Sequence, residues 1–361
     1  MPEYLSETER AVILGLIRNP EHKDKEISEA MDMSIFTFNK VKNNLLREGA
    51  LDRFYVPNYG KIGFGILAVS HGSGLGAFMD QDRTSRFDKG VEDQIIFGIF
   101  EGDNGLAFHL LEDYRDLKDT MRIKEKVLDT VGLDEGALEH VLIPTKDLHV
   151  ERFFDIESLL TEDLGERAAP YLEAKTPAQL AASVSWSDFF QTSQPTEELD
   201  DESSSTLLEL VRSGGTGEGE LLERLDISRY RFHRIKERLL EDGYIKPFYA
   251  TDIMRLGLNV MIFTHLRLKP GQDPHELFER YKDKMPSNLM IVAFDRADVI
   301  GLGVFKDLPA GSDIQMRMRR SMMEHGFLKK EPVIRIFSLP NIRKKETLTF
   351  HRPLKRLMGT R

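Results

Sequence analysis

The sequence predicts an α+β protein in which two winged helix-turn-helix domains alternate with two ferredoxin-like βαββαβ domains. Three observations lead to this prediction. Residues 205–257 align without a gap on residues 11–63, so one module occurs twice. Each copy contains three segments with apolar residues at helical spacing, followed by residues typical of strands. Behind each copy, strand and helix patterns follow in the order βαββαβ, which is the split βαβ arrangement.

The internal repeat is recognised by identical residues at equivalent positions. Among the matched pairs are Leu16/Leu210, Ser34/Ser228, Leu45/Leu239, Gly49/Gly243, Phe54/Phe248, Tyr55/Tyr249 and Gly63/Gly257. The repeated unit is as long as a whole module, far above the roughly 20–50 residues of a solenoid repeat. We therefore interpret the chain as a tandem duplication, a fused dimer with a pseudo-two-fold axis. Because the exposed face of each predicted sheet needs a cover, we expect the two sheets to form an intramolecular pseudo-dimer. Such a chain can still form a homodimer through other surfaces.

The first winged unit is expected over residues 1–65. Ser6 and Glu9 form a capping box at the start of its first helix. A short second helix follows, and Ser34 caps a third helix that ends at Gly49, the residue type preferred after a helix. Residues 50–63 are read as a β-hairpin that turns around Pro57-Asn58. The second unit, over 203–258, repeats these elements.

The ferredoxin-like domains are expected over 66–155 and 259–345, more clearly in the second than in the first, whose first helix is a weak pattern near 75–92. Residues 156–202 are read as a helical insert and an acidic linker, because the stretch TEELDDESSS has the composition of a flexible segment. Residues 346–361 are read as a basic C-terminal tail that could lie on DNA.

Composition excludes several classes of protein. The chain has no cysteine, so disulfides, thiolate zinc sites and cysteine-ligated iron–sulfur clusters are excluded. No apolar run approaches the roughly 20 residues of a membrane helix, and the N-terminus does not resemble a signal peptide, so we expect a cytoplasmic protein that does not contact a membrane. The histidines show no metal-ligand spacing, and no catalytic signature occurs. We therefore expect no catalytic residues, no metal and no cofactor.

Both predicted wings carry the pattern Asp/Asn, two residues, basic, aliphatic, Gly, at Asn58–Gly63 and Asp252–Gly257. With this pattern, a winged helix followed by a βαββαβ domain resembles the Lrp/AsnC (feast/famine) family of prokaryotic transcription regulators. The effector domain of that family has a Gly-Asp-x-Asp turn, matched in part by Gly102-Asp103 and by Asp298. The resemblance implies binding to double-stranded DNA and a small-molecule effector held near Gly102, Asp103 and Asp298.

The third helix of each winged unit would enter the DNA major groove. Because the net charge is −10, any contact with nucleic acid must be local. In the second unit the exposed face carries hydrogen-bond donors for bases and phosphates, namely Arg229, Tyr230, Arg231, His233, Arg234 and Arg238. The equivalent face of the first unit is less charged and carries Thr37, Asn39, Lys40, Asn43 and Asn44. On an isolated helix such side chains would simply be solvated. The duplicated winged-helix context favours DNA contact for residues 228–242, whereas for residues 34–48 both interpretations stay open.

Three functions follow from this reading. The preferred one is a transcription regulator, not an enzyme, with two DNA-reading heads, one of which could serve RNA polymerase or another transcription protein. The enzymatic alternative is a protein resembling the siroheme decarboxylases, which share the two-domain plan and a wing sequence similar to Leu51-Asp-Arg53-Phe54. Their effector hairpin is preceded by a His-Asn-Tyr-Glu-Arg-like stretch, where this chain has residues 93–97 and 287–291 without His or Tyr. This difference argues against the enzyme. The third is a scaffold whose winged helices bind protein.

Overall fold

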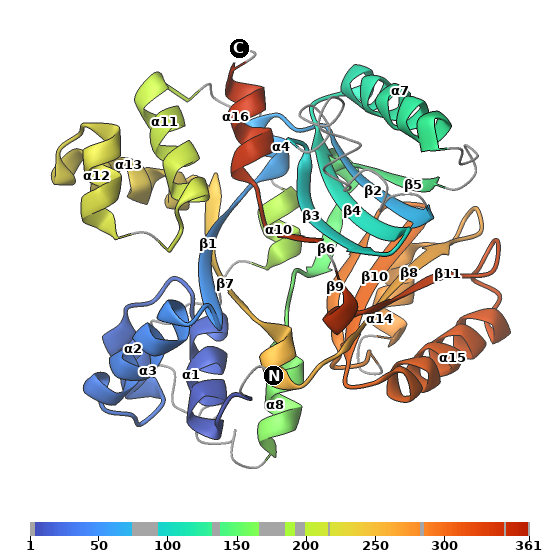
Figure 1. Ribbon diagram of the computed structural model, residues 1–361, viewed down its shortest axis with the longest axis horizontal. Coiled ribbons are helices and arrows are strands. Elements are labelled where there is room, and N and C mark those ends of the chain that lie inside the picture. The colour runs from blue at the N-terminus through green and yellow to red at the C-terminus, as the bar shows by residue number, and fades with distance from the viewer. Residues whose placement is uncertain are drawn as a thin grey trace.

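The computed structural model describes residues 4–73, 93–131, 138–165, 185–191, 199–215, 217–281, 285–342 and 344–359. It confirms the α+β class, since helical units accompany a two-stranded ribbon and two five-stranded sheets. In Figure 1 the two helical units lie on the left, the two sheets lie on the right, and the ribbon runs between them. Within the described part of the chain, no helix is long and apolar enough to cross a membrane.

The first helical unit consists of α1 (Glu7–Arg18), α2 (Asp24–Ala30) and α3 (Ile35–Arg47). The capping box forms as expected: Glu9 accepts from the backbone N–H of Ser6 at 2.7 Å, and Ser6 Oγ accepts from the N–H of Glu9 at 3.4 Å. The Ser34 side chain caps α3 by accepting from the backbone N–H of Thr37 at 3.1 Å. The apolar faces of the three helices meet in a core that contains the fully buried Phe38.

The second helical unit consists of α11 (Asp201–Arg212), α12 (Glu218–Leu225) and α13 (Arg229–Glu241). Here the prediction of an acidic, flexible linker is wrong, because its second half forms the first turns of α11. The Asp200 carboxylate caps this helix by accepting from the N–H of Ser203 at 2.7 Å. Acidic residues in a first helical turn also interact favourably with the helix dipole. The acidic, serine-rich residues that were predicted to be flexible therefore form the start of a helix.

The expected wing hairpins are not formed. Each unit supplies one strand, β1 (Leu51–Pro57) or β7 (Ile245–Thr251), and the two strands pair antiparallel with each other. After β1 the chain forms the short helix α4 (Tyr59–Ile62), and after β7 the 3-10 turn η5 (Ile253–Leu256). The Asp/Asn-x-x-basic-aliphatic-Gly pattern explains this outcome. The Asn58 side chain caps the turn by accepting from Lys61 N–H at 3.1 Å, and the glycine that ends the pattern adopts a positive φ of 111°.

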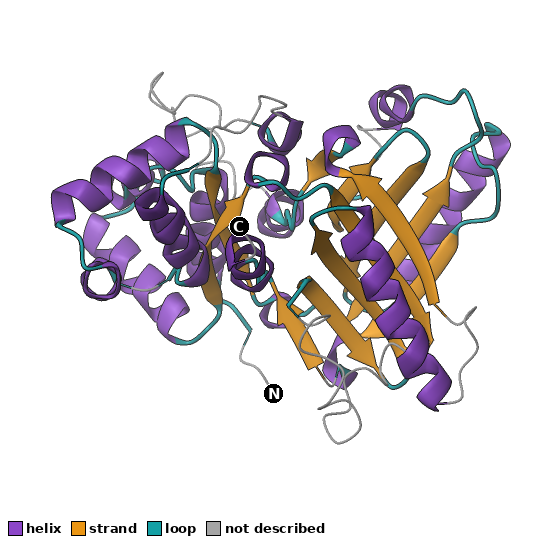
Figure 2. Cartoon of the chain, turned by 90° about the horizontal axis from the view of Figure 1, so that it is seen from above, coloured by secondary structure: helices purple, strands orange, loops and turns teal. Residues whose placement is uncertain are grey.

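The first sheet has the strand order β12-β3-β4-β2-β5. Its strands are β2 (Ile66–Ser73), β3 (Ile95–Glu101), β4 (Asn104–Leu111), β5 (Leu138–Pro144) and β12 (Lys344–Thr347). Helix α7 (Tyr114–Val131) packs along its outer face (Figures 1 and 2). The weak helix predicted near 75–92 lies outside the described residues.

The second sheet has the strand order β11-β8-β10-β9-β6. Read from β6 to β11, this is the same arrangement of equivalent strands as in the first sheet. Its strands are β8 (Val260–Arg267), β9 (Leu289–Phe294), β10 (Asp298–Phe305), β11 (Val333–Ser338) and β6 (His149–Arg152). Helices α14 (Pro274–Tyr281) and α15 (Leu308–Glu324) cover its outer face. The short 3-10 turns η3 (Thr145–Asp147) and η7 (Leu339–Asn341) precede β6 and β12.

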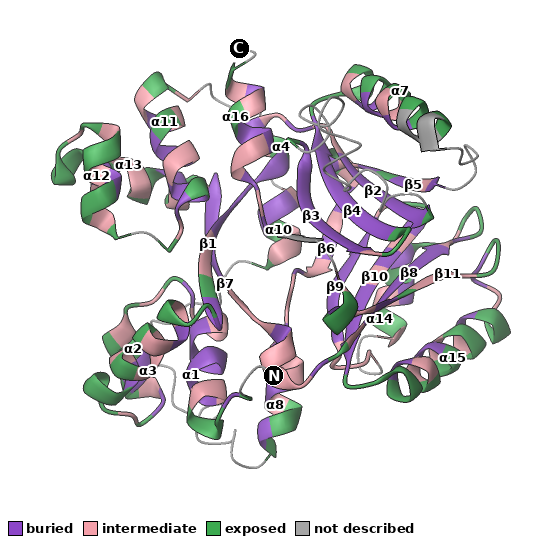
Figure 3. Ribbon diagram, viewed as in Figure 1, coloured by how far each residue is buried: buried purple, intermediate pink, exposed green. Residues whose placement is uncertain are grey.

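The two sheets exchange their edge strands. Strand β6 follows the first ferredoxin-like domain but pairs with β9 of the second, and β12 follows the second domain but pairs with β3 of the first. The inner faces of the sheets also touch, since the rings of His71 and Phe263 lie 5.0 Å apart. Figure 3 shows the strands as the most buried part of the molecule. The two sheets therefore pack on each other within one chain, as expected for a pseudo-dimer.

The segments read as insert and tail contribute to this core. From the insert, α8 (Glu157–Leu164) packs on α1, and α10 (Trp186–Gln191) packs on β6. The interpretation of residues 346–361 as a tail lying on DNA is corrected, because α16 (His351–Gly359) is a packed helix. Leu354 is completely buried, and Arg356 forms an ion pair with Asp116 of α7 at 3.1 Å. The apolar side chains between the basic residues drive this packing.

Candidate functional site

Helix α13 displays the predicted DNA-contact residues of the second unit, but acidic neighbours offset most of their charge. Tyr230 is 78% exposed, and Arg234 is also exposed. Ion pairs link the other basic side chains to acids: Arg229–Glu218 at 3.0 Å, Arg231–Glu202 at 2.5 Å, His233–Glu218 at 3.3 Å and Arg238–Asp242 at 3.3 Å. Exposed pairs of this kind contribute little to stability, yet they reduce the positive potential that would attract a phosphate.

Helix α3 presents the equivalent face of the first unit. Thr37, Lys40 and Asn43 are exposed, while Asn39 and Asn44 are half-buried. Some of these groups are used within the helix: the Thr37 and Ser34 hydroxyls are 2.8 Å apart, and Asn44 accepts from Arg47 at 2.9 Å. The aromatic Phe36 is 78% exposed, like its equivalent Tyr230.

The three predicted effector residues do not form one site. Gly102 and Asp103 make an exposed turn whose neighbour Glu101 accepts from Ser338 N–H at 2.8 Å, at one end of the second sheet. Asp298 lies opposite Arg267, at the other end of that sheet. Its buried carboxylate already accepts from His265 at 2.7 Å and from Arg267 at 3.0 Å. Burial raises and these hydrogen bonds lower the pKa of Asp298, with a net lowering.

A buried polar cluster that the sequence analysis missed lies between α7 and the outer face of the first sheet. We call Lys124, Ser70, His109 and His140 the Lys124 cluster. The Lys124 ammonium donates to Ser70 Oγ at 2.7 Å and lies 3.2 Å from His109 Nε2. Ser70 Oγ is also 2.9 Å from His140 Nδ1. Four elements, α7, β2, β4 and β5, thus direct one polar group each into the layer between the helix and the sheet.

Burial controls the charge of this cluster. It lowers the pKa of Lys124 to about 7, so this side chain exchanges its proton near neutral pH. Burial also lowers the pKa of His140 to about 3 and that of His109 well below its usual value, and in both cases the charge of Lys124 adds to the effect. Among the described residues, no carboxylate forms an ion pair with Lys124. A buried cation without a counter-ion is costly, and strongly perturbed groups of this kind concentrate at functional sites.

A second network fixes α7 beside the Lys124 cluster. Thr120, one helical turn before Lys124, donates to Gln94 at 2.7 Å, and Gln94 donates to Asp116 at 2.9 Å. A sequence signal existed, because Leu117, Met121 and Lys124 follow helical spacing and the lysine therefore falls on the buried stripe.

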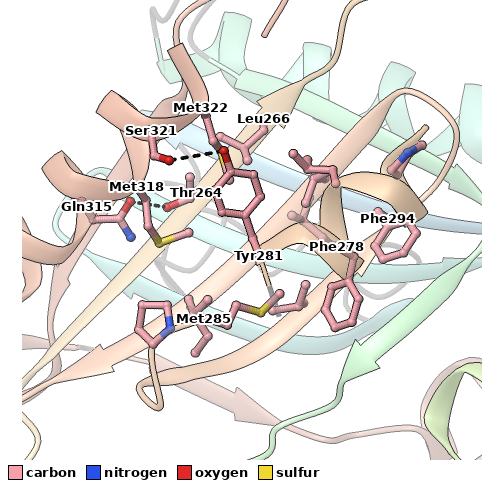
Figure 4. Close-up of a pocket in the computed structure, with 18 residues that line it drawn as sticks. Thr264, Leu266, Phe278, Tyr281, Met285, Phe294, Gln315, Met318, Ser321 and Met322 are labelled. Atoms are coloured by element: carbon pink, nitrogen blue, oxygen red, sulfur yellow. Dashed lines mark hydrogen bonds between the residues drawn. The ribbon is translucent and has the colours of Figure 1, made fainter. Parts of the chain in front are cut away.

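The equivalent layer of the second half is an apolar pocket between α14, α15 and the second sheet (Figure 4). Thr264 takes the place of Ser70, and Met318 takes the place of Lys124 on the helix. Figure 4 shows Met318 beside Tyr281, whose hydroxyl accepts from Ser321 at 3.3 Å. Thr264 donates to Gln315 at 3.1 Å. The two halves therefore share a backbone plan and differ in chemistry at the same position.

The inner faces of the sheets hold one further titratable pair. The rings of His71 and its equivalent His265 are 6.1 Å apart. His71 is completely buried, and neither of its ring nitrogens has a hydrogen-bond partner among the described residues. Burial lowers the pKa of His71 to about 4, so the ring is neutral at neutral pH.

Known proteins resemble this chain in structure but not in sequence. No family model and no curated protein sequence matches the chain. The solved structure of the siroheme decarboxylase NirDL matches with a TM-score of 0.51 and 13% identity, covering 98% of this chain and 99% of that chain. The same decarboxylase in co-complex with an iron-uroporphyrin III analogue matches with a TM-score of 0.51 and 11% identity over the same shares. LrpC of B. subtilis covers 39% of this chain and 95% of its own, with a TM-score of 0.31 and 19% identity.

These comparisons correct one prediction. The expectation that the protein is not an enzyme is overturned, because two structures that match over 98% of this chain are of an enzyme. At this level of identity the likeness shows the fold. The chemistry depends on the side chains that this chain places in that fold.

Proposed function

We propose that the protein is a decarboxylase of the siroheme decarboxylase type, which removes side-chain carboxylates from a tetrapyrrole, and that the Lys124 cluster is its reacting site. The observation that carries the proposal is Lys124, a buried ammonium group with a pKa of about 7 and no acidic partner among the described residues. The full-length likeness to siroheme decarboxylase supports the choice of substrate class. A tandem duplication, supported by the equivalent strand orders of the two sheets, would explain why the second half has lost the lysine.

The cluster fits the chemistry of losing carbon dioxide from an acetate side chain. A substrate carboxylate would complete the coordination of the Lys124 ammonium and accept from the Ser70 hydroxyl. The apolar layer around the cluster replaces the water that stabilises a free carboxylate. When the carbon–carboxylate bond breaks, its electron pair moves onto the methylene carbon and into the conjugated pyrrole. One proton must then reach this carbon to give a methyl group.

Lys124 is suited to deliver that proton. A general acid works best when its pKa lies near the operating pH, and the pKa of Lys124 is about 7. His109 and His140 remain neutral and can relay a replacement proton, because His140 contacts Ser70 and Ser70 contacts Lys124. The chain therefore supplies a donor, a hydrogen-bonded relay and an anion-binding cation at one place.

The test is anaerobic incubation of the protein with siroheme, followed by mass spectrometry of the tetrapyrrole and by absorbance to measure binding. The matched variant is Lys124→Met, since Met318 shows that this helix position accepts methionine in the other half. We expect loss of carbon dioxide by the wild type and a fall of at least about 100-fold in the variant, the usual contribution of a general acid. Met318→Leu is the control and should decarboxylate at the wild-type rate. Unchanged turnover in Lys124→Met, or no turnover by the wild type, would contradict the proposal.

DNA binding through α3 and α13 is the second candidate function, favoured by the exposed Tyr230 and Arg234. Double-stranded DNA would be the partner of this surface, and RNA polymerase or another transcription protein is the alternative partner of one helical unit. Binding would require that phosphates displace acids such as Glu202 from Arg231. A small-molecule effector of this function would have to bind away from Asp298, because that carboxylate is already bonded.

A further inference from the structure

Two histidines from opposite halves of the sequence face each other at the edge of the second sheet. His149 lies in β6, the strand that the first half contributes, and His275 lies in the first turn of α14. Their Nε2 atoms are 3.2 Å apart, although the residues are 126 positions apart in the sequence. This separation explains why no metal-ligand spacing was visible in the sequence. His275 is exposed and His149 is half-buried, so solvent reaches the pair.

Aromatic packing fixes the orientation of both rings. The His149 ring is stacked on Phe294, with centroids 5.2 Å apart and an interplanar angle of 6°. The His275 ring stands nearly perpendicular to both, with its centroid 5.1 Å from that of Phe294 and 4.0 Å from that of His149. Rings held in this way lose little freedom when they bind an ion, which is the main requirement for a preorganised site.

Two carboxylates lie beside the pair. Asp273 accepts from the backbone N–H of His275 at 2.9 Å, and Asp147, two residues before His149, forms an ion pair with Arg296 at 3.4 Å. Gln191 of α10 lies at hydrogen-bond distance from His149 Nδ1, and its amide nitrogen is also 3.4 Å from Nε2. A metal on Nε2 requires the proton on Nδ1, so the Gln191 amide would turn its oxygen to Nδ1 and accept from it. A second partner of this kind sets the tautomer and orientation of a ligating histidine.

We propose that His149 and His275 bind one borderline divalent transition-metal ion, such as Zn²⁺, through their Nε2 atoms. With Zn–N distances of about 2.0–2.1 Å, two nitrogens on a tetrahedral ion lie about 3.3 Å apart, close to the spacing seen here. The described residues contain no cluster of three metal-ligating side chains, so water would fill the remaining positions. The ion would tie the exchanged strand β6 to α14 of the other half and stabilise their contact. Without an ion, the same spacing holds a hydrogen bond between the rings.

The experiment uses the full chain, freed of metal with a chelator and dialysed, and titrates Zn²⁺ by calorimetry. We expect one ion per chain for the wild type. His275→Gln keeps a polar side chain at an exposed position and should weaken binding at least about tenfold. His149→Gln is the second variant and should have the same effect. His325→Gln, at the C-terminal end of α15, is the control and should bind like the wild type.

Two further readouts separate this site from general histidine binding. Cu²⁺ bound to the wild type should give electron paramagnetic resonance couplings to two imidazole nitrogens, and His275→Gln should remove one of them. Zn²⁺ should raise the unfolding midpoint of the wild type but not that of His275→Gln, because a ligand stabilises only the state that binds it. Wild-type affinity in His275→Gln, or no stoichiometric binding in the wild type, would overturn the proposal.

Discussion

Phe54 and Phe248 are opposite each other at the middle of the β1–β7 ribbon, and they are also equivalent residues of the two repeats. The pairing is symmetric on either side of them, with Leu51 opposite Thr251 and Pro57 opposite Ile245. A local two-fold axis therefore passes between the two phenylalanines. The strands that were expected to form separate wings instead join the two helical units.

The ribbon depends on a glycine of the second helical unit, so Gly214→Ala should destabilise the protein. A Cβ atom at Gly214 would lie 2.4 Å from the Arg53 carbonyl oxygen and 2.8 Å from the Phe54 Cα, both of which are backbone atoms that cannot rotate away. We expect a loss of about 1–3 kcal/mol in the free energy of unfolding, typical of overpacking. Gly215→Ala is the matched control, because nothing lies within 4 Å of its added atom. Equal urea midpoints for the two variants would contradict this close approach.

The ribbon and the exchanged strands also show where sequence patterns stop being informative. The periodicity of α1, α3 and α13 and the βαββαβ order could be predicted, because each reflects local spacing of apolar residues. The partner of β1 could not, since a strand has the same pattern whether it pairs within a hairpin or with a strand of the other half. Pairing over such long separations is set by the whole fold.

Two segments were predicted wrongly for a different reason. In both of them the sequence contains local signals for a helix, but the prediction followed their charged composition. The stretch before α11 is acidic and rich in serine, yet Asp200 stands where a helix cap is needed. The last segment is basic, yet Phe350, Leu354 and Leu357 follow helical spacing and are buried. The candidate site was missed although a local signal was present: Lys124 was not singled out, yet its spacing from Leu117 and Met121 places it on the buried stripe.

Helix α16 is part of the core, so Leu354→Ala should be strongly destabilising. Its side chain is completely buried, and removing buried methyl groups costs about 2–5 kcal/mol, depending on how far the cavity collapses. Lys355→Ala changes an exposed neighbour and should leave the unfolding free energy within about 0.5 kcal/mol of the wild type. Chemical denaturation of the two variants decides the point. A wild-type midpoint for Leu354→Ala would mean that the last helix does not pack as described.

The buried His71 should make the protein less stable in mild acid. Its pKa is about 4 in the folded state and about 6.5 when unfolded, so the unfolded chain binds more protons between these values. The stability contribution is therefore complete above pH 6.5 and is lost as the pH falls toward 4, by up to about 3 kcal/mol. His71→Leu should show a smaller loss of unfolding free energy between pH 7 and pH 5, measured with urea. An unchanged pH dependence in the variant would place the acid sensitivity elsewhere.

Lys124 should lower stability while it supports turnover. Its pKa is about 7 in the folded protein and 10.5 otherwise, so the unfolded chain binds more protons between these values and stability rises with pH across that window. Lys124→Met should therefore raise the unfolding free energy at pH 7, by up to about 5 kcal/mol, while it slows decarboxylation by at least about 100-fold. The wild-type rate should also fall as the pH rises through about 7, because the ammonium form donates the proton. A destabilised variant would indicate that the lysine is structural.

DNA binding, if it occurs, should depend on α13 more than on α3. Arg231→Ala combined with Arg234→Ala removes two groove donors, each worth about 1–3 kcal/mol if it contacts a base with two hydrogen bonds. Asn43→Ala with Asn44→Ala should cost less. Glu202→Gln should strengthen binding, because it frees Arg231 from an ion pair of 2.5 Å. Fluorescence titrations with labelled DNA, selected from random sequence, at two salt concentrations measure these effects, and binding should weaken steeply with salt. Equal losses of DNA affinity from the substitutions in α3 and in α13 would contradict the expected dominance of α13. If neither Glu202→Gln nor the double arginine variant changes the affinity, α13 does not contact DNA.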